Sequence, residues 1–165
     1  MSRLVILPPD YPAVAGSLVF LAGPIQGAPD WQADAVRLLG EFAPALHVAN
    51  PRRVYLPGQF EYAAQVDWET HHLRLAASRG VILFWLAREI APTPGRAYAQ
   101  TSRFELAEWK MRHERDGARL VVGIEQGFSG ERYVRRRFAQ DCPGVPLCES
   151  LEEVCRLAAE SSGAR

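Results

Sequence analysis

Short, continuous apolar runs alternate along this chain with longer segments of helical periodicity, and this alternation restricts the possible folds more than any other feature. The strongest run, GVILFWL at 80–86, is apolar throughout, which is typical of a central parallel strand covered on both faces. Further strands are expected at 4–7, 17–22, 46–50, 119–125 and 145–148, and helices at 30–42, 60–77, 101–114, 131–140 and 151–159. The pattern predicts an α/β fold: an open, doubly wound parallel sheet of about five strands between two helical layers.

Length and charge narrow the functional classes. The 165 residues suit one domain over 1–165, and 19 basic residues balance 19 acidic ones. A nucleic-acid-binding protein normally carries a basic excess, so a small-molecule partner is expected and a nucleic-acid polymer is not. The N-terminus lacks a signal-peptide core and no apolar run reaches membrane-spanning length, which predicts a cytoplasmic protein with no membrane partner.

The motifs give no indication of a metal or an organic cofactor. The three cysteines have no CxxC spacing, and the chain contains neither HExxH nor a dinucleotide fingerprint. We therefore expect no metal, no cofactor and reduced, partly buried thiols.

The expected sheet also predicts where a ligand binds. Ligands of such sheets lie beyond the carboxyl ends of the strands, near the point where strand order reverses. The loops after Ala22, Asn50, Leu86 and Glu125 should therefore hold the site.

Three segments could carry chemistry, and each has a purely structural alternative. FLAGPIQG at 20–27 is a strand followed by a glycine-containing loop, which is either a ligand loop or a plain turn. QVDWETHHL at 65–73 places Asp67 and Glu69 on a helix, where ordinary solvated charges are the alternative. TSRFELAEW at 101–109 places Glu105 in the first turn of a helix, but Ser102-x-x-Glu105 also fits a capping box, which spacing alone favours.

Taken together and in this order, the segments resemble the nucleoside 2-deoxyribosyltransferase family, in particular its short bacterial deoxyribosyltransferase-like branch. The matching pieces are FLAGPI, NPRR at 50–53, QVDWETHHL before GVILFWL, and the glutamate of SRFELAEW, and they cover about Val19 to Trp109. The resemblance implies a flavodoxin-like fold and double-displacement chemistry in which Glu105 attacks the anomeric carbon. It implies that Asp67 or Glu69 orients the glutamate or the sugar. With the strand-end location, it gives an expected substrate-binding set of Ala22, Gly23, Pro24, Ile25, Asn50, Arg52 and Trp85.

The sequence departs from the family around Glu105. Family members carry an aspartate shortly before the glutamate, whereas residues 99–104 read AQTSRF and contain no carboxylate. The group that protonates the leaving base therefore has no candidate here.

Three functions remain open. The first is transfer of 2-deoxyribose between bases through a covalent glycosyl-glutamate intermediate. The second is N-glycosidase activity on a nucleoside or nucleotide, for which Arg52, Arg53 and the amides near Gly27 could bind a phosphate. The third is a non-catalytic nucleotide-binding or sensor protein.

The resemblance also implies an oligomer with sites near subunit interfaces. Aromatic residues near the expected loops agree with a homodimer or a higher homo-oligomer that uses helix 60–77 as a contact surface. These aromatic residues are Phe60, Tyr62, Trp68, Tyr98 and Phe128.

Overall fold

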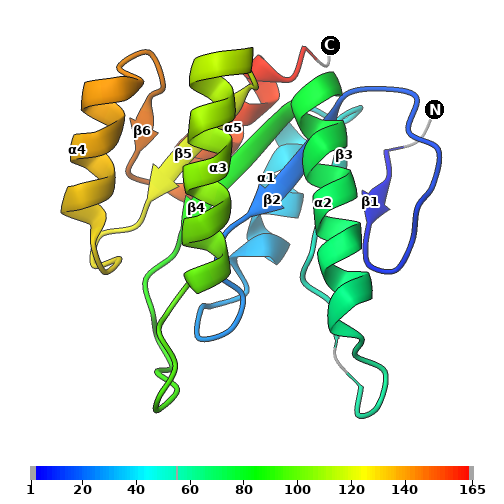
Figure 1. The fold of residues 1–165 in the computed structure, drawn as a ribbon. Helices are drawn as coiled ribbons and strands as arrows, with labels where there is room; N and C mark the ends of the chain where they lie inside the picture. Colours follow the sequence, from blue (N-terminus) through cyan, green and yellow to red (C-terminus); the bar gives the residue numbers. More distant parts are fainter. Residues whose placement is uncertain (1–2, 55, 164–165) are drawn as a thin grey trace.

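A sheet of six parallel strands forms the centre of the structure, a computed structural model that describes residues 3–54 and 56–163 (Figure 1). The strands are β1 (Val5–Ile6), β2 (Leu18–Ala22), β3 (His47–Ala49), β4 (Val81–Leu86), β5 (Leu120–Ile124) and β6 (Leu147–Cys148). Their spatial order is β1-β3-β2-β4-β5-β6, and every neighbouring pair is parallel. The expected doubly wound sheet is confirmed: it has six strands where about five were expected, and short β1, in the segment 4–7 expected as a strand, pairs with the outer side of β3.

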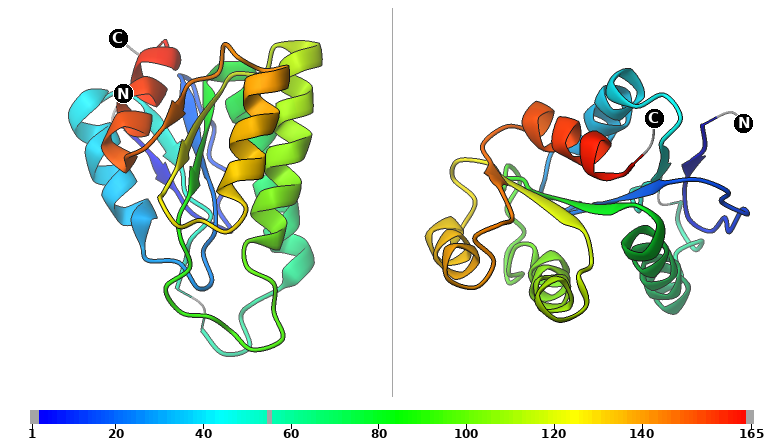
Figure 2. Two further views of the ribbon diagram at one scale, coloured as in Figure 1. Left: turned by 90° about the vertical axis from the view of Figure 1, so that its left-hand side faces the viewer. Right: turned by 90° about the horizontal axis from the view of Figure 1, so that it is seen from above.

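Five helices cover the two faces of this sheet (Figure 2). Helices α1 (Trp31–Phe42) and α5 (Leu151–Ser161) lie on one face. Helices α2 (Tyr62–Arg79), α3 (Gln100–Asp116) and α4 (Glu131–Asp141) lie on the other. The three-layer α/β/α arrangement is therefore the one that the alternating pattern predicts.

Two cores result, one on each side of the sheet. Val19 and Leu21 point toward α1 and α5, whereas Leu18 and Phe20 point toward the other layer. All residues of β2, β4 and β5 are buried. This two-sided burial explains why these strands read as continuous apolar runs in the sequence and show no alternation of polar and apolar residues.

The connections between strands define the point at which the strand order reverses. From β2 the chain passes through α1 to β3 on one side, and then through α2 back across β2 to β4. The carboxyl ends of β2 and β4 thus lie side by side at the point where ligands bind in such sheets. At this junction Gly23 has φ +152°, and a Cβ there would lie 2.2 Å from the carbonyl oxygen of Trp85.

The three cysteines, Cys142, Cys148 and Cys155, are buried and unpaired, as expected from their spacing. No helix within the described ranges has the length and apolar character needed to cross a membrane.

Candidate functional site

A cavity of about 670 Å³ opens at the carboxyl ends of β2 and β4. The loop after β2, the first half of α2, the loop between β4 and α3, and the start of α3 all contribute to its wall. Its position is the one that the strand order predicts.

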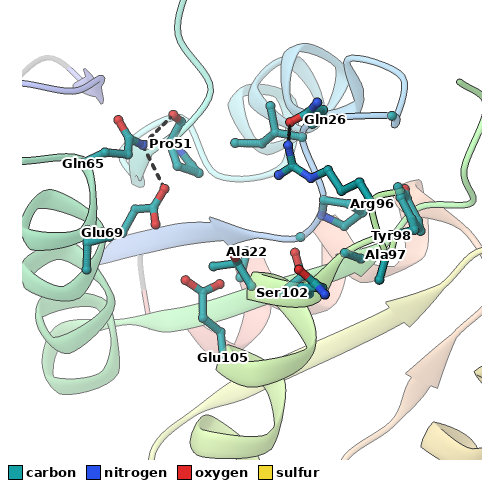
Figure 3. A pocket seen from close by; sticks show the side chains of 18 of the residues that line it. Ala22, Gln26, Pro51, Gln65, Glu69, Arg96, Ala97, Tyr98, Ser102 and Glu105 are labelled. Atoms are coloured by element: carbon teal, nitrogen blue, oxygen red, sulfur yellow. Dashed lines mark hydrogen bonds between the residues drawn. The ribbon is translucent and has the colours of Figure 1, made fainter. Parts of the chain in front are cut away.

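Glu105 lies on the wall formed by α3 and points into the cavity (Figure 3). Burial is the main cause that raises the pKa of this carboxyl to about 8, and the nearby carboxylates of Glu69 and Glu108 raise it further. A carboxyl group held in a cavity with its pKa displaced by burial and by like charge is typical of a reactive site.

The capping-box interpretation of Glu105 is wrong. Helix α3 begins at Gln100, its N-cap residue is Ala99, and no side chain caps it. Ser102 therefore lies inside the helix, and Glu105 is one turn beyond it, so Glu105 cannot act as the acidic partner of a capping box. The side chain is directed to the cavity and not to the helix end.

Glu69 approaches the same cavity from α2, on the opposite wall (Figure 3). Its Oε1 accepts a hydrogen bond of 2.8 Å from Gln65 Nε2, which also donates to the carbonyl oxygen of Pro51 at 3.3 Å. Burial raises the pKa of Glu69, and the Gln65 hydrogen bond partly opposes that shift. Gln65 thus fixes one carboxylate oxygen of Glu69.

Of the two acidic residues predicted on α2, only Glu69 lies at the cavity. Asp67 is exposed and is not part of the cavity wall. Positions 67 and 69 are about 200° apart around a helix, so both could not face the same side. The structure therefore removes Asp67 from the candidate site.

The loop after β2 lines the cavity as expected. Ala22, Gly23, Pro24 and Ile25 all contribute to its wall. Gly27, with φ +83°, accepts hydrogen bonds through its carbonyl oxygen from the amides of residues 90 and 91, which ties this loop to the chain after β4.

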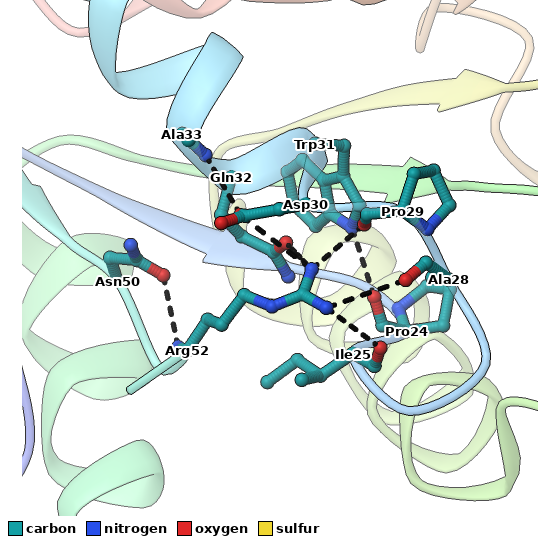
Figure 4. A network of polar contacts seen from close by, with 10 residues as sticks. All are labelled: Pro24, Ile25, Ala28, Pro29, Asp30, Trp31, Gln32, Ala33, Asn50 and Arg52. Atoms are coloured by element: carbon teal, nitrogen blue, oxygen red, sulfur yellow. Dashed lines mark hydrogen bonds and ion pairs between the residues drawn. The ribbon is translucent and has the colours of Figure 1, made fainter. Parts of the chain in front are cut away.

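Arg52 and Asn50 support this loop from behind and do not line the cavity (Figure 4). The Arg52 guanidinium donates to the carbonyl oxygens of residues 25, 28 and 29 and to Gln32 Oε1, at 2.8–3.3 Å. Asn50 Oδ1 accepts from the Arg52 amide at 2.9 Å. The NPRR segment was expected to bind substrate, but these two residues lie outside the cavity wall and bond within the fold, so their contact with substrate stays a prediction.

Trp85 is also placed outside the cavity. It is buried in the core that faces α1 and α5, and its ring packs against Gly123. Adjacent strand residues point to opposite faces, so a residue near the end of β4 can be buried in the core below the site without touching it.

Several cavity residues had no clear signal in the sequence. Gln65, Arg96, Tyr98 and Ser102 lie on the wall. Tyr98 donates its hydroxyl proton to the carbonyl oxygen of Ala87 at 2.7 Å, and burial is the main cause that raises its pKa. Only the i, i+4 spacing of Gln65 and Glu69 could have suggested that this pair acts together.

No group of three or more His, Cys, Asp or Glu side chains suited to a metal ion occurs within residues 3–54 and 56–163.

Fold and site together define a doubly wound α/β protein with two facing carboxyl groups in a cavity at its topological switch point. A family model described as "Nucleoside 2-deoxyribosyltransferase like" matches residues 16–128. The chain belongs to this family.

Comparison with solved structures supports the fold. A search of curated proteins found no match. A solved structure described as a conserved protein from Enterococcus faecalis V583 is similar at 10% sequence identity, with a TM-score of 0.50. The match covers 88% of this chain and 98% of that one.

Proposed function

We propose that the protein cleaves or exchanges the N-glycosidic bond of a 2-deoxyribonucleoside-type substrate, with Glu105 as the nucleophile. The observation that carries this proposal is the placement of Glu105 and Glu69 on opposite walls of one cavity. Membership of the deoxyribosyltransferase-like family supports the substrate class.

The two carboxyl groups suit the two halves of the reaction. Repulsion between them favours a state in which one holds a proton and the other is ionised. With the charge on Glu105, its carboxylate oxygen forms a bond to the anomeric carbon while the carbon–nitrogen bond breaks and the electron pair leaves with the base. With the proton on Glu69, this group can supply the proton that the departing base takes up.

The second half-reaction determines whether the enzyme is a transferase or a hydrolase. A new base that attacks the anomeric carbon gives transfer and releases the Glu105 carboxylate, whereas water in the same position gives hydrolysis. Exposed residues such as Phe60, Tyr62 and Arg96 lie at the cavity wall, so water reaches the site in the single chain. This access favours N-glycosidase activity as the second candidate function.

One incubation separates these functions. Purified protein is mixed with deoxynucleosides, with and without a free acceptor base, and the products are separated by chromatography. A new nucleoside that forms only with acceptor indicates transfer, and free base with free deoxyribose indicates hydrolysis. Binding without turnover would overturn the proposed chemistry and leave a sensor role.

A further inference from the structure

Gln65, on the cavity wall formed by α2, has its side-chain amide held in one orientation. Its Nε2 donates to Glu69 Oε1 at 2.8 Å and to the carbonyl oxygen of Pro51 at 3.3 Å. A carbonyl oxygen can only accept, so a flipped amide, with Oε1 in place of Nε2, would lose the bond to Pro51. The amide of Gln65 therefore presents an N–H group, and not an oxygen, to Glu69.

This orientation leaves the other atom of the amide without a partner. Gln65 is 7% exposed, and its Oε1 is a buried acceptor that has no hydrogen bond among residues 3–54 and 56–163. A buried acceptor without a partner lowers stability, and such groups in native proteins call for an explanation. A side chain that served stability alone would not carry this cost. The unpaired oxygen therefore indicates that the N–H group of Gln65 has a role at the cavity.

The carbonyl group of Pro51 is itself held in place. Pro51 is buried and lies between Asn50 and Arg52. Asn50 Oδ1 accepts from the Arg52 amide, and the Arg52 guanidinium donates to carbonyl oxygens of the loop after β2 (Figure 4). These bonds tie segment 50–52 to the loop after β2. Gln65 thus connects a fixed part of the backbone to the carboxyl group of Glu69.

The bond from Gln65 also determines which oxygen of Glu69 can hold a proton. Oε1 already accepts from an N–H group, so a proton on this carboxyl group is placed on Oε2. Within the described chain Oε2 has no hydrogen-bond partner. Figure 3 shows this oxygen on the side of Ala22 and Glu105. A proton on Oε2 is therefore turned toward the space next to Glu105.

We propose that Gln65 is a positioning residue for proton transfer, which holds Glu69 with its proton on Oε2 and directed at the departing base. This inference rests on the proposed function, in which Glu69 protonates that base. As the carbon–nitrogen bond breaks, its electron pair goes to the base, the Oε2–H bond breaks, and the base takes the proton. Glu69 becomes a carboxylate, and the N–H group of Gln65 stabilises the new charge. In the second half-reaction the attacking base or water returns a proton to Oε2.

Two leaving groups separate this role from a purely structural one. The base of 2′-deoxyadenosine or 2′-deoxycytidine needs a proton to depart, whereas 4-nitrophenolate departs from 4-nitrophenyl 2-deoxyriboside as a stable anion. Gln65→Met keeps a similar side-chain length and removes the amide. In this variant kcat for the better deoxynucleoside should fall about tenfold or more, with KM little changed. Because no proton is needed, kcat for the 4-nitrophenyl substrate should stay within about threefold of the wild-type value.

Two further variants complete the kinetic test. Gln140→Met, at an exposed position on α4, is the matched control and should leave both rates unchanged. Gln65→Asn keeps an amide but shortens the side chain by about 1.5 Å, so it should show the same selective loss if Gln65→Met does not fold. Equal losses for the two leaving groups, or no loss, overturn the proposal. Failure of both Gln65 variants to fold would show a structural role and overturn it as well.

Failure of the proposed function gives a different result. If the wild type turns over none of these substrates, NMR titration of isotope-labelled glutamate carboxyl groups tests the Gln65–Glu69 pair alone. Burial raises the pKa of Glu69 and the Gln65 hydrogen bond partly opposes that shift, so the Glu69 midpoint should move to higher pH in Gln65→Met. It should stay in place in Gln140→Met. An inactive protein with this shift loses the proposed function and keeps the position of the proton, whereas an unmoved midpoint overturns the inference.

Discussion

Glu105 lies where burial and two neighbouring carboxylates act in the same direction on its proton. A nucleophile must be ionised, so this environment makes the ionised form of Glu105 a minority near neutral pH. The same burial leaves that carboxylate poorly solvated, which increases its reactivity.

Glu105→Gln should retain the fold and lose about a thousandfold or more of turnover, because an amide cannot form the glycosyl ester. Steady-state kinetics measures the loss, and mass spectrometry of acid-quenched wild-type protein should find the sugar on the peptide that contains Glu105. Glu41→Gln is the matched control, since Glu41 pairs with Arg37 at 2.8 Å on α1 and lies outside the cavity wall. A Glu105→Gln variant with full activity would exclude this nucleophile.

The pH dependence should report both cavity carboxyls. In the wild type, the active form holds one proton between the two groups, so kcat/KM should rise and then fall with pH, with the upper midpoint near the Glu105 pKa of about 8. Glu69→Gln removes a negative charge, so the midpoint should move to lower pH, while kcat falls because the base loses its proton donor. Asp67→Asn, on the same helix but exposed, should leave the midpoint in place. An unshifted midpoint in Glu69→Gln would show that the two groups do not interact.

Stability should change with pH for the same physical reason. The folded protein holds the Glu105 proton up to a pKa of about 8, whereas the unfolded chain releases it near 4.5. The folded state therefore binds more protons between these values, and this contribution to stability is lost as pH rises from about 4.5 to 8. Urea denaturation should show that the free energy of unfolding of Glu105→Gln increases relative to that of the wild type by about 1–3 kcal/mol over this pH range. A difference that stays constant with pH would contradict the raised pKa.

At the scale of the secondary-structure elements, close packing at the junction of β2 and β4 leaves no room for a side chain at Gly23. A Cβ at Gly23 would meet the Trp85 carbonyl oxygen at 2.2 Å and the Trp31 ring at 2.8 Å. Gly23→Ala should therefore cost about 2 kcal/mol or more of unfolding free energy. Gly144→Ala, which meets nothing within 4 Å, is the control and should change stability little. Chemical denaturation monitored by tryptophan fluorescence measures both, and equal effects would mean that the junction is not tightly packed.

The elements themselves were largely predictable, but the directions of their side chains were not. Strands β2, β4 and β5 are continuous apolar runs, because both faces of the sheet are covered. Helix α3 was expected to begin at a serine cap, yet it begins at Gln100 after a strained Ala99, and neither residue carries a start signal. Arg52 and Trp85 lie near strand ends in sequence and Asp67 lies on α2 beside Glu69, but loop packing, strand alternation and helix rotation turn each away from the cavity.

On the scale of the whole molecule, apolar exposure is uneven. Of the five aromatic residues that suggested an interface, Trp68 and Phe128 are buried in the core and Tyr98 is partly buried and donates to a carbonyl oxygen. Phe60 and Tyr62 are 49% and 74% exposed. Their neighbours Val54, Leu56 and Val66 are exposed as well. Fewer exposed aromatic side chains are therefore available for self-association than the sequence suggested. Those that remain lie at the N-terminal end of α2 beside the cavity.

We expect the protein to form a homodimer or a higher homo-oligomer through this surface. Exposed apolar side chains beside a cavity are typical of an interface, and a second copy there would reduce the access of water to the glycosyl intermediate. Light scattering at micromolar concentration should give at least twice the 18.4 kDa chain mass. Tyr62→Glu should shift the mass toward the monomer, because it places a charge in the contact. Tyr133→Glu, 66% exposed on α4, should leave the mass unchanged. A monomer mass for the wild type, with full activity, would show that the single chain encloses its own site.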